Sequence, residues 1–220
     1  MKITAVIPAY NEAAQIAAVV SGLKPYVNEI IVVDDASRDR TGAEALGAGA
    51  LVLRHIINRD QGAALRTGTD FALRRGADII IHFDADGQFL AEDIPSVIAP
   101  LLKGTADAVL GSRFMGKESK MPKSKRYLIM PLARFINRLF FNIRLSDPQS
   151  GFRALNRTAA EKIKIKSDGK AHCSEIIYQL FRQKLRVQEV PITVLYHHYG
   201  QKFSGGLTII KDLIIQKLIQ

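Results

Sequence analysis

The first 112 residues alternate short apolar runs with longer helix-like segments, and this alternation constrains the fold more than any other feature of the chain. The apolar runs are dominated by Val, Ile and Leu, as expected for strands buried on both faces. This spacing predicts an α/β fold, a mainly parallel sheet with helices on both of its faces. The expected strands are Ile3–Ile7, Glu29–Val33, Ala50–Arg54, Ile79–Phe83 and Ala106–Leu110, and the expected helices are Glu12–Leu23, Thr41–Gly47, Gly62–Arg75 and Ile94–Leu102.

Charge is distributed unevenly along the 220 residues, whose formal net charge is +10. Residues 1–112 carry 10 Lys and Arg against 14 Asp and Glu, whereas residues 113–220 carry 21 against 7. This asymmetry indicates an acidic or metal-binding half joined to a half that meets anions such as nucleic acid, phosphate groups or an anionic membrane surface. A cationic surface that only improves solubility is the alternative.

Cysteine content and hydropathy indicate in which cellular compartment the protein is expected. Cys173 is the single cysteine, which excludes a disulfide-framed module and a Cys-built zinc site. No apolar stretch reaches the roughly 18 residues typical of a membrane span, and the N-terminus has no signal-peptide pattern. We therefore expect a cytoplasmic protein.

The second half of the chain lacks the regular strand–helix alternation of the first. Residues 113–126 hold six cations and one acid and predict a basic loop. A helix is expected at Ser174–Lys184 and a strand at Val187–Leu195. Tyr127–Asn142 and Leu207–Ile219 are apolar stripes that suit either core helices or in-plane contact with a membrane.

Polar residues follow the first two expected strands, at the edge where ligands bind in parallel sheets. Pro8 is expected to end the first strand and Asn11 to cap the next helix. Tyr10 and Glu12 could then stack against and hold a base. Asp35 follows the second strand, where a carboxylate often holds ribose hydroxyls. The first turn lacks the Gly-x-Gly-x-x-Gly pattern, which excludes a nicotinamide enzyme.

The strongest chemical signal is Asp84-Ala85-Asp86-Gly87-Gln88, after the fourth strand. Carboxylates two residues apart point to opposite faces of a regular strand, but a turn at Gly87 would let them converge. Two carboxylates beside a diphosphate provide the hard oxygen ligands that Mg²⁺ or Mn²⁺ prefers. The ligand spacing of a calcium-binding helix–loop–helix is absent.

Six motifs in consistent order from about residue 2 to residue 200 resemble family 2 glycosyltransferases. The similarity is greatest to polyprenol-phosphate sugar transferases of the dolichol-phosphate mannosyltransferase type. Asp60 occupies a position where the family usually has Gly. The motifs are Pro-Ala-Tyr-Asn-Glu at 8–12, Val-Val-Asp-Asp-x-Ser-x-Asp-x-Thr at 32–41, Asn-Arg-Asp-Gln-Gly-Ala-Ala-Leu-Arg-Thr-Gly at 58–68, Asp-Ala-Asp-Gly-Gln at 84–88, Gly-Ser-Arg at 111–113 and Asp-Pro-Gln-Ser-Gly-Phe-Arg at 147–153.

The resemblance implies a glycosyltransferase type A fold, Rossmann-like, with a C-terminal acceptor-side extension. Residues 1–200 would form the catalytic domain, with a nucleotide-sugar half at 1–112 and an acceptor half at 113–200, and residues 201–220 an amphipathic helix. The implied activity is metal-dependent, inverting transfer of a sugar from a UDP- or GDP-linked donor to a polyprenyl phosphate such as dolichyl or undecaprenyl phosphate.

The resemblance also assigns residues to the donor. Those expected to bind the nucleotide sugar are Pro8, Tyr10, Glu12, Asp35 and Asp84. Those expected to bind Mg²⁺ or Mn²⁺ are Asp84, Asp86 and Gln88.

Three arginines, Arg113, Arg126 and Arg153, are expected to meet the acceptor phosphate. Asp84, Asp86 and Arg113 are the expected catalytic residues. A phosphate monoester has a second pKa near ~6 and is a dianion at pH 7, so such an acceptor needs cations for positioning more than it needs a base.

Other functions compete with this interpretation. A family 2 enzyme could instead glycosylate a sugar hydroxyl, with Asp93 or Glu92 as base. A phosphatase of the Asp-x-Asp-Gly type would carry its motif after an early strand. A nucleic-acid-binding module would suit the basic half but lacks a recognition helix or a single-strand aromatic pattern, so no nucleic acid partner is expected. We expect peripheral contact with the cytoplasmic face of the membrane; a separate membrane-anchoring protein is a further candidate partner.

Overall fold

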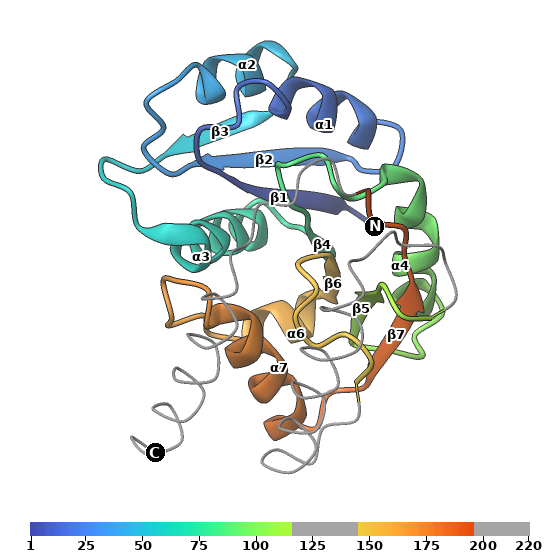
Figure 1. Cartoon of the computed structure of the whole chain (residues 1–220). Helices are drawn as coiled ribbons and strands as arrows, with labels where there is room; N and C mark the ends of the chain where they lie inside the picture. Colours follow the sequence, from blue (N-terminus) through green and yellow to red (C-terminus); the bar gives the residue numbers. More distant parts are fainter. Residues whose placement is uncertain (116–144, 196–220) are drawn as a thin grey trace.

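The computed structural model describes residues 1–115 and 145–195, and every structural statement below concerns these two ranges (Figure 1). The expected acceptor residue Arg126, the apolar stripes at Tyr127–Asn142 and Leu207–Ile219, and the expected helix at 201–220 lie outside them. Among the described residues, no helix combines the length and the hydropathy that crossing a membrane requires.

A seven-stranded sheet in the order β3-β2-β1-β4-β6-β5-β7 forms the centre of the molecule. Strands β1 to β4 are mutually parallel, and β5 is parallel to β7. Only β6 runs antiparallel to both of its neighbours, β4 and β5. The predicted mainly parallel sheet is confirmed. The strands are β1 Ile3–Ala9, β2 Glu29–Asp34, β3 Leu51–Arg54, β4 Ile79–His82, β5 Ala108–Ser112, β6 Arg153–Asn156 and β7 Val187–Pro191.

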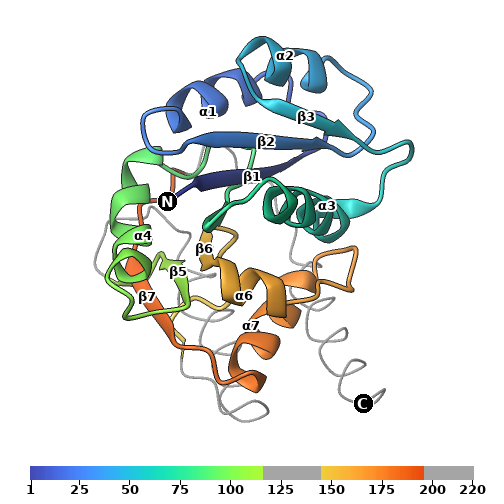
Figure 2. The ribbon, with the colours of Figure 1, turned by 180° about the vertical axis from the view of Figure 1, so that it is seen from behind.

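Helices cover both faces of this sheet, as Figures 1 and 2 show from opposite sides. Strand residues alternate between two apolar cores: Ile7 faces the core with α1, α2 and α4, whereas Val6 faces the core with α3, α6 and α7. The first group is α1 Ile16–Leu23, α2 Thr41–Gly47 and α4 Ile94–Leu102, with the short 3₁₀-helix η1 Ala91–Asp93 before α4; the second is α3 Asp60–Arg74, α6 Arg157–Lys162 and α7 His172–Arg182.

The two halves expected from the charge distribution share this single sheet. Strand β6, from the second half, lies between β4 and β5 of the first half. The Asp147–Arg153 motif leads directly into β6, so it reaches the end of β4 where the Asp84–Gln88 motif begins. Register pairs His82 of β4 with Arg153 of β6.

Two local expectations at the end of β1 were wrong. Pro8 does not end the strand, which continues to Ala9. The ladder between β1 and β4 stops at Val6, so on that side the missing N–H of Pro8 costs no hydrogen bond. Asn11 does not cap α1, which begins at Ile16. Asn11 has a left-handed φ of 56°, and its side chain accepts a hydrogen bond from the Arg38 N–H at 2.8 Å.

Candidate functional site

The site lies at a topological switch point of the sheet. Strand β1 has β2 on one side and β4 on the other, and all three run in the same direction. Ligands in open α/β sheets bind beyond the carboxyl ends of strands at such a point. The motifs at 8–12, 34–35 and 84–88 lie at the carboxyl ends of these three strands, so the fold places them at one edge.

The Asp84–Gln88 segment forms the turn that the sequence predicts. Gly87 has a φ of +70°, a left-handed conformation that glycine adopts without strain. The Gln88 N–H donates to Asp86 Oδ1 at 3.0 Å and closes the turn. Behind it, the rings of Phe83 and Phe89 both contact Phe152, with centroids 5.0 and 5.4 Å away. These aromatic contacts fix both ends of the turn on the apolar core.

Asp84 is held from two sides. Gln61, near the start of α3, donates from its side-chain amide to Asp84 Oδ1 at 2.9 Å. The Gly151 backbone lies directly against the same carboxylate, and a Cβ at position 151 would overlap Oδ2. Burial and the neighbouring negative charge of Asp86 raise the pKa of Asp84 to about 7, although Arg153 acts in the opposite direction.

A third acid, Glu12, joins this pair. Its pKa is raised by burial and then by the negative charges of Asp86 and Asp39. Carboxylates from the ends of β1 and β4 therefore repel one another across a shared space. Within the described ranges, no three His, Cys, Asp or Glu side chains could hold a metal ion by themselves.

This donor set fits Mg²⁺ or Mn²⁺ bound together with a diphosphate, because Mg²⁺ is usually held by one or two carboxylates plus substrate phosphates. Asp84 and Asp86 would hold the ion. Gln88 contributes its backbone N–H to Asp86, and its own carbonyl accepts from the Leu195 N–H at 2.8 Å. A cation between the carboxylates would also relieve their mutual repulsion.

The expected nucleotide residues differ in how accessible they are. The Tyr10 side chain is 42% exposed and free to stack against a base, whereas Pro8 is buried. Asp35 is only 3% exposed. Its Oδ1 lies 2.6 Å from His55 Nδ1, and both of its oxygens accept from the Arg59 N–H. In this structure Asp35 orders the loop before α3.

Arg113 is bound to Asp147, the first residue of the 147–153 motif. Its Nε and Nη2 donate to the two carboxylate oxygens of Asp147 at 2.5 and 2.6 Å. The Arg113 side chain is 20% exposed and that of Asp147 is fully buried. Glu189 of β7 accepts from the Asp147 N–H at 2.9 Å. The guanidinium is therefore the partly exposed member of an otherwise buried hydrogen-bonded network.

Arg153 lies elsewhere. It has no exposed surface and points into the interior from β6. Its guanidinium donates to the backbone carbonyls of Ser150 and Gly151 and to the sulfur of Cys173. In this structure Arg153 therefore presents no exposed atom to an acceptor phosphate, and its expected contact with the acceptor stays a prediction.

Sequence reasoning missed several residues around Asp84. Gln61 lay within a recognised motif, but its carboxylate contact depends on the placement of α3. Asp60 has a φ of +67°, which explains why glycine is usual there and why Asp, which tolerates this region better than most residues, can replace it. Cys173, the single cysteine, lies 3.2 Å from the Arg153 guanidinium. Burial raises its pKa, but Arg153 and His172 outweigh that effect and bring the pKa to about 6.

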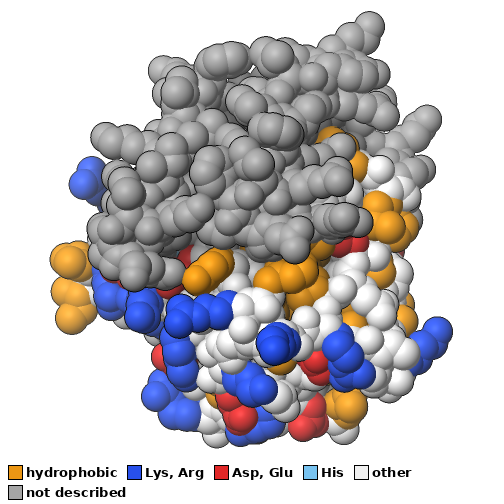
Figure 3. Space-filling model, turned by 90° about the horizontal axis from the view of Figure 1, so that it is seen from below, with side chains coloured by type: hydrophobic (Ala, Val, Ile, Leu, Met, Phe, Trp, Pro, Cys, Tyr) orange, Lys and Arg blue, Asp and Glu red, His pale blue; other side chains and the backbone are white. Residues whose placement is uncertain are grey.

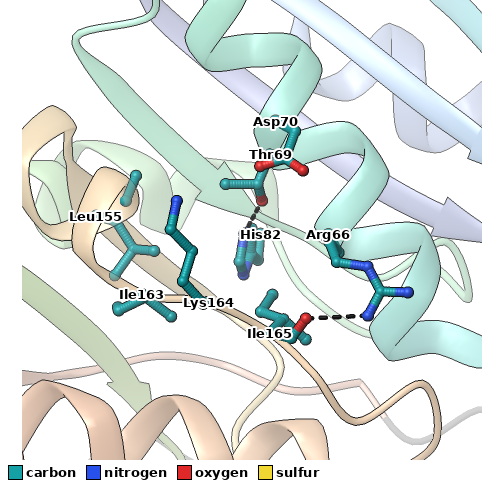
Figure 4. Close-up of a pocket in the computed structure, with 9 residues that line it drawn as sticks. Arg66, Thr69, Asp70, His82, Leu155, Ile163, Lys164 and Ile165 are labelled. Carbon is teal, nitrogen blue, oxygen red and sulfur yellow. Dashed lines mark hydrogen bonds between the residues drawn. The ribbon is translucent and has the colours of Figure 1, made fainter.

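A cavity of about 110 Å³ lies beside this site and not within it (Figure 4). Its walls come from α3, β4, β6, α6 and the segment after α6, and none of the expected site residues lines it. His82 lies within it and is hydrogen-bonded to Thr69 Oγ1 at 2.9 Å. Burial and the nearby Arg153 and His172 lower the pKa of His82 well below its usual range, so the ring is neutral.

Two named relatives match almost the whole chain. The UDP-N-acetylglucosamine–dolichyl-phosphate N-acetylglucosaminyltransferase of Methanococcus voltae is 33% identical over 239 residues, covering 97% of this chain and 95% of the relative. The undecaprenyl-phosphate mannosyltransferase of Micrococcus luteus is 31% identical over 220 residues, covering 94% of this chain and 89% of the relative.

A solved structure confirms the fold. Glucosyl-3-phosphoglycerate synthase from Mycobacterium tuberculosis, in complex with Mg²⁺ and UDP, superimposes with a TM-score of 0.76 at 21% identity, covering 97% of this chain and 78% of that one. Residues 4–164 match the model of the glycosyl transferase family 2. The chain belongs to glycosyl transferase family 2 and is a glycosyltransferase.

Proposed function

We propose that this enzyme transfers a sugar, with inversion and with Mg²⁺ or Mn²⁺, from a UDP- or GDP-linked donor to a polyprenyl phosphate. The observation that carries the proposal is the cluster of Glu12, Asp84 and Asp86 at the switch point of the sheet. Acidic side chains that repel one another would themselves repel a nucleotide diphosphate. They suit a nucleotide sugar only when a cation lies between them and the donor.

Residues at the carboxyl ends of the strands would bind the donor and the cation. A bound divalent cation would neutralise charge on the leaving diphosphate. Asp84 and Asp86 would hold it, with Asp84 oriented by Gln61 and by the Gly151 backbone. The exposed Tyr10 ring offers a surface on which the base can stack. Asp35 would support the pocket through the His55–Arg59 loop, where its hydrogen bonds already lie.

The acceptor side needs positive charge. An oxygen of the acceptor phosphate would attack the anomeric carbon from the face opposite the diphosphate, forming a C–O bond as the bond to the leaving diphosphate breaks. No proton has to be removed from a phosphate dianion. Arg113, held by Asp147 just after the end of β5, would orient this phosphate.

The competing hydroxyl acceptor would require a base. Asp93 is 4% exposed, and its Oδ2 already accepts from the Thr193 N–H at 2.7 Å. That position does not favour Asp93 as a base, whereas Glu92 is exposed on η1. The names of the two relatives support the phosphate acceptor, because one names dolichyl phosphate and the other undecaprenyl phosphate.

A lipid acceptor implies contact with a membrane surface. Residues 145–195 carry nine Lys and Arg against five Asp and Glu. Figure 3 views the molecule from below, the side on which α6 and α7 lie in Figure 1. Lys and Arg side chains are prominent on this face, with fewer acidic ones among them. We propose peripheral association. Flotation with anionic vesicles should show binding at low salt and release at high salt, and absence of binding at both would refute it.

The central experiment measures transfer with a panel of UDP- and GDP-sugars, Mn²⁺ and a short polyprenyl phosphate. Asp84→Asn and Asp86→Asn should abolish metal-dependent nucleotide binding, seen as a lost thermal shift. Asp70→Asn on the exposed face of α3 is the matched control and should behave like the wild type. Undiminished binding in both site variants would refute the donor site. Faster turnover with a sugar hydroxyl would refute the acceptor class.

A further inference from the structure

Arg153 has the least expected environment of any charged residue in the described part of the chain. It is the largest fully buried side chain, with 0% of its surface exposed. Burying a guanidinium costs several kcal/mol unless it is compensated by hydrogen bonds or opposite charge. A buried arginine that stays in a protein therefore has a structural or functional partner, and its contacts identify it.

Two of the three printed partners of the guanidinium belong to one turn, Ser150–Gly151. Nη2 donates to the Ser150 carbonyl at 3.1 Å, and Nε donates to the Gly151 carbonyl at 3.4 Å. Nη2 also lies 3.2 Å from the sulfur of Cys173 on α7. Arg153 thus holds the two residues that precede β6 by their backbone and connects them to a helix on the sheet face.

The same turn forms one wall around Asp84. The Gly151 backbone touches the carboxylate so closely that no side chain fits between them. Gln61 fixes the opposite side of the carboxylate through Oδ1. Among the described residues, a shift of the turn away from Asp84 would leave only the hydrogen bond from Gln61 to orient the carboxylate.

We propose that Arg153 is a positioning residue for Asp84, acting through the Ser150–Gly151 turn, and not a contact for the acceptor. The proposal rests on the proposed function in that Asp84 is taken to contact the cation and the donor diphosphate. It moves Arg153 from the acceptor side of the reaction to the donor side. Arg113 and Arg153 should then have opposite kinetic signatures.

The test compares Arg153→Met and Arg153→Lys with the surface control Arg74→Gln, which lies on the exposed face of α3. The first readout is the affinity for Mn²⁺ together with UDP or GDP, whichever the wild type binds. It is measured by calorimetry and by electron paramagnetic resonance of Mn²⁺. Loss of a residue that orients a metal ligand typically weakens metal binding about 10–100-fold, so we expect that loss for Arg153→Met. Arg153→Lys keeps the positive charge and one donor nitrogen, so it should recover part of the lost affinity.

The second readout is the KM for the polyprenyl phosphate, which should stay near the wild-type value in both variants. Unchanged Mn²⁺–nucleotide affinity combined with a raised acceptor KM would overturn the proposal and return Arg153 to the acceptor. Unchanged values of both quantities would overturn it as well. Failure of the proposed function is distinguishable, because Asp84→Asn would then leave Mn²⁺–nucleotide affinity intact.

A measurement on the wild type covers the case in which Arg153→Met does not fold. Crystals soaked with Mn²⁺, the nucleotide and inorganic phosphate should show the guanidinium still bonded to the Ser150 and Gly151 carbonyls. A guanidinium turned outward onto the phosphate would refute the positioning role.

Discussion

Replacing Gly151 by Ala should disable the donor site while leaving the fold intact. The added methyl carbon would overlap Oδ2 of Asp84 and lie 3.0 Å from its Cγ and Oδ1, where ordinary contacts begin at 3.4 Å. Gly151 is not among the glycines with positive φ, so alanine introduces no backbone strain. The atom that must move is therefore the Asp84 carboxylate.

The size of the effect follows from this overlap. Restoring normal contact distances requires a displacement of the carboxylate on the order of 1 Å, and a misplacement of that size costs about 10²-fold in rate. This corresponds to about 2.7 kcal/mol of transition-state stabilisation. The loss in folding stability should be smaller, about 1 kcal/mol for the hydrogen bond from Gln61.

The assay measures kcat/KM for sugar transfer, Mn²⁺–nucleotide affinity and the free energy of unfolding on the same preparations. Gly47→Ala is the matched control, because it ends α2 and a Cβ there meets nothing within 4 Å. This control should keep full activity and gain up to about 1 kcal/mol from helix propensity. A folded Gly151→Ala enzyme with wild-type kcat/KM and metal affinity would refute the reasoning.

Three further predictions concern other parts of the chain. Arg113→Ala should reduce transfer to the lipid phosphate far more than nucleotide binding, measured by steady-state kinetics and calorimetry; equal losses would contradict its acceptor role. Gly68→Ala should lower the free energy of unfolding by about 1–3 kcal/mol in urea, because a Cβ would overlap a methyl of Val6, and wild-type stability would contradict this close packing. Hydrogen bonds from Arg186 hold the pKa of Asp107 well below its usual range. The ionised carboxylate therefore stabilises the folded state above about pH 4, and this contribution is lost as pH falls below that value. Asp107→Asn should therefore lower the free energy of unfolding by about 1 kcal/mol at pH 7 and by less at pH 3, measured by urea unfolding. An equal loss of stability at both pH values would contradict the ion pair.

Local sequence determined most of the parallel half of the sheet. Runs of β-branched residues predict strands β1 to β4 because such strands are buried on both faces, and only their ends shifted. The turn at Gly87 also follows from local chemistry, since glycine permits the left-handed φ that the turn requires. Motif order was sufficient to indicate family 2.

Tertiary structure decided what each polar side chain does. Two arginines of similar motifs have opposite environments, because Arg113 follows the end of β5 while Arg153 begins a strand inserted between β4 and β5. Asp35 and Asp84 both follow parallel strands, but neighbouring segments pack against them differently. Asp35 is hydrogen-bonded to the loop before α3, whereas Asp84 lies near the negative charge of Asp86. Burial and partners depend on contacts between residues far apart in the chain. A sequence pattern lists the groups that can do chemistry, and the packing of the sheet selects those that meet the substrate.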